Sequence, residues 1–183
     1  MNKILIIIDA QNDFIDGKLG NRSATRAVPK IMDKITNGYY NGIFLTKDYH
    51  TICPAVKTIE HKRVPEHCLL DSYGEKFNQG ISEAIDKCSS PIIIIQKCTF
   101  LDSKLSEVIN DFARDNDLDM KDTTIEICGF CTDICVISNA LYLRSIYPYT
   151  KIVCDSEACA GSTPEMHYKA LDVMRSNLID VIY

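Results

Sequence analysis

Hydrophobic positions follow two patterns along this chain. Continuous apolar runs rich in β-branched residues indicate strands that are buried on both faces of a sheet. Longer stretches repeat their apolar residues at helical spacing. The pattern predicts strands at residues 3–8, 42–46, 91–96, 123–128, 150–154 and 178–182, and helices at residues 24–36, 81–87, 103–114, 132–146 and 164–175.

Local signals support two of these helices. Thr163 is a suitable N-cap for the last helix, and Pro164 suits its first position. Pro29, in the helix predicted at 24–36, is acceptable only near a helix start. Alternating strands and helices predict an α/β fold, a three-layer doubly wound arrangement with a mostly parallel sheet of about six strands and helices on both faces. We expect residues 1–183 to form a single domain.

Composition narrows the function classes. The formal net charge is -5 and no cluster of Lys and Arg stands out, which argues against binding to nucleic acid or to an anionic membrane. The apolar run at the N-terminus stops at Asp9, too early for a signal peptide, and no later run reaches the length of a membrane span. Nine cysteines, an odd number without framework spacing, suggest reduced thiols in a cytoplasmic protein.

Four chemically capable residues follow the predicted strands. Asp9, Asp48 and Lys97 stand directly at strand ends, and Cys135 stands one turn beyond another. In parallel α/β sheets, ligands bind at the carboxyl ends of the strands. The long stretch at residues 49–77 has no periodicity, which is unusual in a compact domain unless the loop is functional. The sequence therefore predicts an active site at this edge of the sheet.

Cys135 is the candidate nucleophile. If Thr132 is the N-cap of the helix, Cys135 lies in the first helical turn, where the helix dipole stabilises a thiolate. Asp9 is then the candidate base, Lys97 the cation that keeps its partners ionised, and the turn before Cys135 a source of N–H groups for an oxyanion. Cysteine is also often buried as a small hydrophobic side chain, and we interpret Cys128 in this way.

Two metal hypotheses arise from the same region. Asp48, His50 and His67 carry ligand types suited to zinc or another divalent ion, with His61 as a competitor for the third position. His167, in the first turn of a charged helix, is interpreted as solvated. As an alternative of a different class, the C-x-x-C-x-x-x-C spacing of residues 128–135 could hold zinc or an iron–sulfur cluster.

Five motifs give the chain a family resemblance. They are IIIDAQNDFIDG, TKDYH, VPEHC, IIIIQKCTF and GFCTDICV, in this order over nearly the whole length. With them the chain resembles the isochorismatase-like cysteine hydrolases, and within these the nicotinamidase arm. The resemblance implies a catalytic triad of Asp9, Lys97 and Cys135.

The resemblance implies further features of the site. One is a divalent metal ion, zinc in particular, on Asp48, His50 and His67. Another is a cis peptide bond between Phe130 and Cys131. The N–H groups of Cys131 and Cys135 would then form the oxyanion hole.

The implied reaction is cleavage of the C–N bond of a small amide through a thioester. The best match is nicotinamide, giving nicotinate and ammonia in pyridine nucleotide salvage, by a homo-oligomeric enzyme. The chain has no tryptophan, and Tyr49 and Val64 stand where the family has ring-stacking aromatics; Phe14, with Phe100 or Phe130, is a candidate for lining the substrate pocket. Another small amide, or an isochorismatase-type substrate, stays as an alternative, and the metal motif favours an amide.

Overall fold

The fold is built on one parallel sheet. The structure, a computed structural model, describes residues 2–51 and 59–183. Its six strands lie in the order β3-β2-β1-β4-β5-β6, and every pair is parallel. The strands are β1 (Asn2–Ile8), β2 (Gly42–Asp48), β3 (Ile92–Lys97), β4 (Thr123–Phe130), β5 (Lys151–Ala160) and β6 (Asp180–Ile182). The predicted fold class and all six predicted strands are confirmed.

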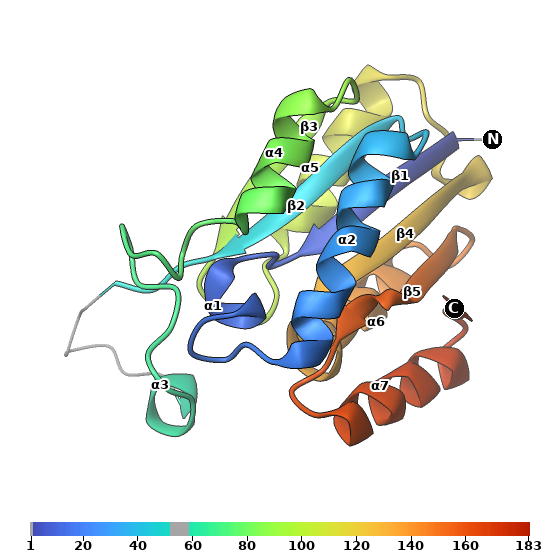
Figure 1. Ribbon diagram of the computed structural model, residues 1–183. Helices are drawn as coiled ribbons and strands as arrows, with labels where there is room; N and C mark the ends of the chain where they lie inside the picture. The colour runs from blue at the N-terminus through green and yellow to red at the C-terminus, as the bar shows by residue number, and fades with distance from the viewer. Residues whose placement is uncertain (1, 52–58) are drawn as a thin grey trace.

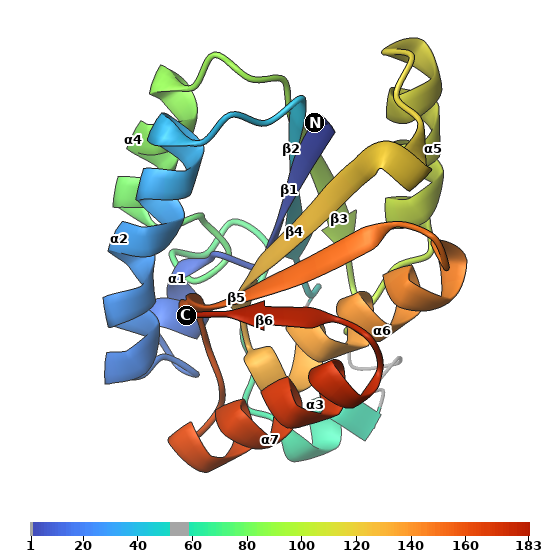
Figure 2. The same ribbon diagram turned by 90° about the vertical axis from the view of Figure 1, so that its right-hand side faces the viewer.

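Helices cover both faces of this sheet. Helices α2 (Arg22–Asn37) and α4 (Gln79–Lys87) lie on one face, and α5 (Lys104–Asp115) and α6 (Ile137–Ile146) lie on the other (Figure 2). Helix α7 (Pro164–Ser176) packs against α6 and β6. The strands in the middle of the sheet are apolar throughout because both of their faces are covered, and Ile4 to Ile8 are at most 1% exposed. No described helix has the length and apolar character needed to cross a bilayer.

Three local predictions need correction. Helix α2 starts at Arg22, with Asn21 as its N-cap, so Pro29 lies in the helix interior. The apolar face of α2, which includes Ala27, Ile31 and Ile35, is buried, and its packing outweighs the cost of the proline. The stretch 49–77 contains a short helix, α3 (Ile59–Arg63), and another short helix, α1 (Asn12–Ile15), follows β1.

The third correction concerns the turn at Thr132–Val136, which contains Cys135 and is called the nucleophile turn below. The chain leaves β4 through a π-helical turn, Thr132–Val136, which continues into α6. The N-cap is Cys131 and its side chain makes no capping hydrogen bond, so Thr132 is not the cap. Cys135 is still within the first turn. The helix that follows β4 therefore begins with a π-helical turn, which is wider than the α-helical turn that we predicted.

The sheet register brings the candidate residues to one edge. Asp48 and Lys97 are directly paired, as the last residues of β2 and β3. Strands β1 and β4 lie side by side (Figure 1). Ile8 pairs with Gly129, so Asp9 lies beside the nucleophile turn. Gly129 has φ +122°, and a Cβ there would lie 2.1 Å from the carbonyl oxygen of Ile8. Only glycine allows β4 to approach β1 this closely at the site.

Candidate active site

The side chains of Asp9, Lys97 and Cys135 meet inside the protein. The Lys97 Nζ lies 2.7 Å from the Asp9 Oδ2 and 3.8 Å from the Cys135 Sγ. All three residues are at most 4% exposed. The structure therefore places a carboxylate, an ammonium group and a thiol in mutual contact, although the residues come from three separate parts of the chain.

Asp9 is held in a fixed orientation. Its backbone has φ +49°, a left-handed conformation that is uncommon for a residue other than glycine. Thr46, on β2, donates a hydrogen bond of 2.6 Å to the Asp9 Oδ1 and accepts one of 3.1 Å from the Asp9 backbone N–H. This doubly bonded threonine keeps the carboxylate directed at Lys97, and we did not identify it from the sequence.

Burial and charge set the protonation states. Burial raises the pKa of Asp9, and the neighbouring Lys97 ammonium partly opposes this rise. Burial alone would lower the pKa of Lys97, but Asp9, Cys135 and Asp48 raise it above its usual range. Lys97 is therefore charged at neutral pH.

The thiol of Cys135 differs from our expectation. Burial raises its pKa well above the usual range, the Asp9 carboxylate raises it further, and Lys97 opposes both. We predicted a thiol made acidic by the helix start. The prediction was wrong because desolvation of a fully buried thiolate outweighs the partial charges of one helical turn. In the free protein the thiol is protonated and lies next to a carboxylate.

The neighbouring cysteines occupy different environments. Cys128 is fully buried in β4, as we predicted. Cys131 follows a cis peptide bond with Phe130, at the position that the resemblance implies, and burial raises the pKa of its thiol to about 12. These two thiols do not join Cys135 in a metal-binding group, since the only such group among the described residues lies elsewhere. The structure does not support the cysteine-ligated cluster.

The group of described residues that could hold a metal ion consists of Asp48, His50 and His67. Their ligand atoms all lie within 4.8 Å of one another, and all three side chains are buried. The Asp48 Oδ2 lies 3.0 Å from the His50 Nε2 and 3.3 Å from the His67 Nε2. Burial would raise the pKa of Asp48, but hydrogen bonds from the two histidines lower it below its usual range. One carboxylate and two imidazoles around a common point are a fitting ligand set for zinc.

Other residues hold this group in place. The His67 Nδ1 lies 2.8 Å from the carbonyl oxygen of Pro65, which orients the ring with its Nε2 toward Asp48. The Gln11 side chain donates to the Asp48 carbonyl at 2.7 Å and accepts from the Asp48 N–H at 2.8 Å. The Glu60 Oε1 lies 3.6 Å from the His67 Nε2, which adds a second carboxylate beside the group. The side chain of His61, our competing ligand, lies outside the described residues.

A small cavity lies between Cys135 and His67. It has a volume of about 30 Å³. Phe14 lines it, and its ring contacts that of His67 edge-on, with centroids 5.5 Å apart. The remaining lining is largely apolar and comes from Leu19, Asp48, Glu60, Val64, His67, Phe100, Cys131, Ile134 and Cys135.

Two of our other candidate residues lie elsewhere. Phe130 is fully buried in the hydrophobic core and does not line this cavity, so it packs rather than binds. His167 is not simply solvated: its Nδ1 lies 2.8 Å from the Thr132 Oγ1, and burial lowers the pKa of its imidazole. Its contact partner is far away in the sequence, so the local charge pattern did not reveal it.

Comparison with known proteins shows which family, relative and solved structures the chain resembles. The isochorismatase domain family matches residues 3–183. The nicotinamidase of Schizosaccharomyces pombe is 31% identical over 204 residues, which cover 97% of this chain and 91% of the relative. The pyrazinamidase/nicotinamidase structure from Streptococcus mutans has a TM-score of 0.80 and 26% identity, and covers 99% of this chain and all of the other. The pyrazinamidase of Pyrococcus horikoshii, in complex with zinc, has a TM-score of 0.73 and 24% identity, and covers all of this chain and 99% of the other.

The fold and the comparisons define this protein as a hydrolase that acts on carbon–nitrogen amide bonds and is built on a parallel sheet covered by helices. The chain belongs to the isochorismatase family.

Proposed function

We propose that this protein is a cysteine amidohydrolase that cleaves the C–N bond of a small amide, with nicotinamide as the substrate. The observation that carries the proposal is the buried contact among Asp9, Lys97 and Cys135 beside the cavity. It agrees with the nicotinamidase activity named for the Schizosaccharomyces pombe relative.

In the first step, Cys135 attacks the amide. The Cys135 Sγ bonds to the amide carbon while its proton passes to the Asp9 carboxylate. The transfer replaces a carboxylate by a thiolate, so the net charge of the buried cluster does not change and Lys97 stabilises both states. The N–H groups of Cys131 and Cys135 stabilise the negative oxygen of the tetrahedral intermediate.

The intermediate then loses ammonia. The C–N bond breaks as Asp9 returns the proton to the departing nitrogen, which leaves a thioester on Cys135. In the second step a water molecule gives a proton to Asp9 and attacks the thioester carbon. The C–S bond breaks, the carboxylic acid leaves, and the proton on Asp9 returns to the Cys135 sulfur. Asp9 acts in turn as base and acid, which suits its raised pKa.

We also propose that Asp48, His50 and His67 hold one divalent ion, zinc in particular. The three ligand atoms surround one point, and the contact of Nδ1 with the Pro65 carbonyl orients the His67 ring toward it. The zinc complex of the Pyrococcus horikoshii pyrazinamidase supports the choice of metal. A bound zinc ion would supply Lewis-acid chemistry at the end of the cavity that Asp48 and His67 line.

The lining of the cavity favours a small planar substrate. Phe14 lies against the ring of His67, so a heteroaromatic amide could pack on Phe14 with its ring nitrogen toward the metal group. The Asp48 and Glu60 carboxylates next to this position disfavour an anionic substrate. Tyr49 is not among the lining residues, and Val64 offers no stacking surface. A small aliphatic amide is therefore the second candidate.

An ammonia-release screen tests the proposal. The substrates are nicotinamide, pyrazinamide and two small aliphatic amides, with isochorismate as the substrate of a different chemistry. We expect ammonia from nicotinamide and pyrazinamide, and slower release from the aliphatic amides. Turnover of isochorismate alone, or no turnover of any amide by metal-loaded protein, would contradict the proposal.

A further inference from the structure

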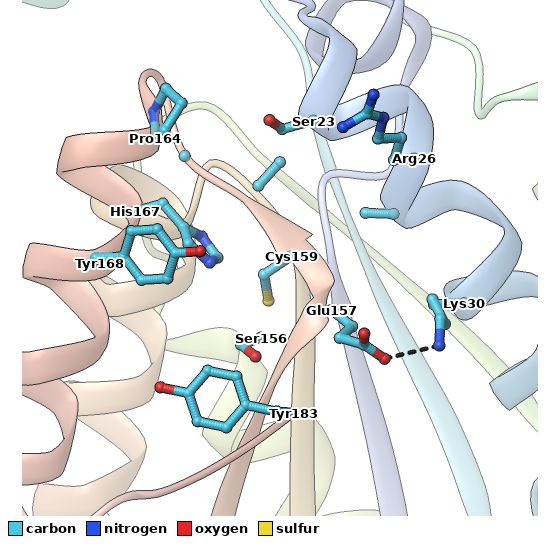
Figure 3. Close-up of a pocket in the computed structure, with 13 residues that line it drawn as sticks. Ser23, Arg26, Lys30, Ser156, Glu157, Cys159, Pro164, His167, Tyr168 and Tyr183 are labelled. Carbon is cyan, nitrogen blue, oxygen red and sulfur yellow. Dashed lines mark hydrogen bonds and ion pairs between the residues drawn. The ribbon is translucent and has the colours of Figure 1, made fainter.

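A second cavity, of about 360 Å³, lies outside the candidate active site. It is bounded by α2, the C-terminal end of β5 and α7 (Figure 3). None of its lining residues contributes to the triad, the metal group or the small cavity beside them. Its volume is within the range of pockets that bind small molecules, roughly 300–1,000 Å³.

One positive charge in this cavity is available to a ligand. Lys30 and Glu157 both line it, and they neutralise each other through an ion pair of 2.7 Å. Arg26 makes no ion pair with any carboxylate in the described part of the chain. Figure 3 shows its guanidinium group and the Ser23 hydroxyl extending from α2 toward the side of α7. A free guanidinium group beside a hydroxyl is suited to a carboxylate.

The opposite wall is aromatic and uncharged. The rings of His167 and Tyr168 on α7 lie 5.1 Å apart at 75°, and His167 is neutral at pH 7 because burial lowers its pKa. Cys159 and Ala160 at the end of β5 complete an apolar floor. The Glu157 carboxylate disfavours a dianion such as a phosphate monoester. A ligand with a flat ring and a single negative charge fits this lining best.

The cavity is connected directly to the nucleophile turn. The His167 Nδ1 lies 2.8 Å from the Thr132 Oγ1. Next to it, the Ser162 N–H and hydroxyl donate to the Asp133 carboxylate at 2.7 and 2.5 Å. Thr132 and Asp133 belong to the same π-helical turn as Cys135.

The loop between β5 and α7 has little room to adjust on its own. Gly161 lines the cavity, and a Cβ on it would lie 2.8 Å from both the Asp133 Oδ1 and the His167 backbone nitrogen. The Asn21 side chain, at the start of α2, donates to the Gly161 carbonyl at 3.1 Å. The loop therefore links the start of α2 to the turn that contains Cys135.

We propose that this cavity binds a small aromatic carboxylate and that its occupancy changes the reactivity of the Cys135 thiol through Thr132 and Asp133. This second site is distinct from the substrate site. It goes beyond the proposed function, since it makes the reactive cysteine responsive to an aromatic acid bound on the other side of the turn.

Binding is tested with 2-naphthoate and isothermal titration calorimetry. The Arg26→Gln variant assigns the binding to the second cavity, because Arg26 lines this cavity and not the one beside Cys135. We expect Arg26→Gln to weaken binding at least about tenfold, because a charge-assisted hydrogen bond is lost. Tyr168→Ala should also weaken it. The control is Arg22→Gln, an exposed arginine of the same helix that does not line the cavity, and it should bind as the wild type does.

Coupling is tested by the rate at which iodoacetamide alkylates Cys135, read by peptide mass spectrometry with the exposed Cys98 as internal reference. Saturating 2-naphthoate should change the Cys135 rate at least about threefold in the wild type and Arg22→Gln, as expected for a coupling of the usual size. Arg26→Gln should show no change at the same concentration. An unchanged wild-type rate would overturn the coupling.

No wild-type binding at millimolar 2-naphthoate, or equal binding by the Arg26→Gln variant, would overturn the site. Neither measurement depends on amide turnover, so failure of this inference and failure of the proposed reaction are distinguishable.

Discussion

The ammonium nitrogen of Lys97 lies 2.7 Å from a carboxylate oxygen of Asp9 in the protein interior. Lys97 is 2% exposed and Asp9 is fully buried. Burying either charge alone would cost several kcal/mol, so each residue depends on the other. The pair also fixes what the thiol can do. A proton that leaves Cys135 moves to Asp9 without creating a new net charge, provided that Lys97 keeps its own.

Lys97→Met should therefore remove most of the amidase activity. Methionine has a similar length without the charge, so Asp9 loses its ion-pair partner and its pKa rises further. A protonated Asp9 cannot accept the proton of Cys135. We expect kcat/KM for ammonia release to fall by at least about 10²-fold, the usual contribution of general acid–base catalysis. Steady-state kinetics of the metal-loaded variant is the measurement.

A matched control for that variant is Lys104→Met. Lys104 is an exposed residue at the start of α5, and its replacement should leave kcat/KM within about twofold. If Lys97→Met kept the wild-type rate while folded, Lys97 would have only a structural role.

Cys135→Ala should abolish turnover, because no thioester can form. We expect a fall of at least about 10⁴-fold in kcat, as found when a nucleophile is removed, with an unchanged circular dichroism spectrum. Cys131→Ala is the comparison, since both cysteines are buried in the same turn. It keeps the backbone N–H that we assign to the oxyanion hole.

The Cys131→Ala variant should keep activity within about tenfold of the wild type, because only a side chain is lost. Comparable activity in Cys135→Ala, or inactivity confined to Cys131→Ala, would contradict the choice of nucleophile. A mass shift of Cys135 after trapping with substrate in acid would show the thioester directly.

The sequence predicted the sheet well for a physical reason. Strands buried on both faces must be apolar throughout, so runs such as residues 3–8 leave a local record of their position. In a parallel sheet all of these strands end at the same edge. The residues that follow them were therefore predicted to meet, and Asp9, Lys97 and Cys135 do.

What the sequence did not reveal depends on contacts between distant segments. Thr46 is one of several threonines, and only the pairing of β2 with β1 brings its hydroxyl to Asp9. His167 meets Thr132 across 35 positions. The predicted direction of the Cys135 pKa shift was wrong because the full burial of this thiol and its contact with Asp9 arise from the packing of distant segments. Gln11 is the exception: it stands in the first motif beside Asp9, and its position there could have suggested a role.

Thr46→Val should shift the pH dependence of the reaction. The Thr46 hydroxyl donates to the Asp9 carboxylate and lowers the pKa of that group. Asp9 must be ionised to accept the proton of Cys135, so activity is lost as the pH falls through the Asp9 pKa. Valine removes the hydrogen bond and raises this pKa. We therefore expect the acid limb of kcat/KM to move to higher pH.

The exposed Thr36, whose hydroxyl bonds only within α2, provides the control for this profile. Thr36→Val should leave the acid limb in place. An acid limb that stayed fixed in Thr46→Val, or that moved to lower pH, would mean that a group other than Asp9 governs it.

His50→Ala and His67→Ala should each abolish tight metal binding, because each removes one of the three ligands on which the site depends. We expect about one zinc ion per wild-type chain and close to none in either variant, measured by elemental analysis after dialysis. His61→Ala should keep its metal. Loss of zinc in His61→Ala, with retention in His67→Ala, would assign the third ligand to His61 instead.

Glu126→Gln should lower stability at neutral pH but not in acid. Glu126 lies in β4 with its side chain 4% exposed, and its carboxylate pairs with Lys34 at 2.6 Å and with Lys3 at 2.8 Å. Burial would raise its pKa, but the hydrogen bonds from these lysines outweigh burial and lower it. A lowered pKa stabilises the fold above the unfolded-state pKa, and this contribution is lost as the pH falls through the folded-state value. We expect urea unfolding to show a loss of about 1–3 kcal/mol at pH 7, with the difference vanishing at acid pH.

The exposed pair of Lys30 and Glu157 is the comparison for this variant. Glu157→Gln should leave stability nearly unchanged at both pH values, because solvent screens that pair. An equal loss for Glu126→Gln at pH 7 and in acid would show that packing, and not the ionised carboxylate, accounts for the contribution of Glu126.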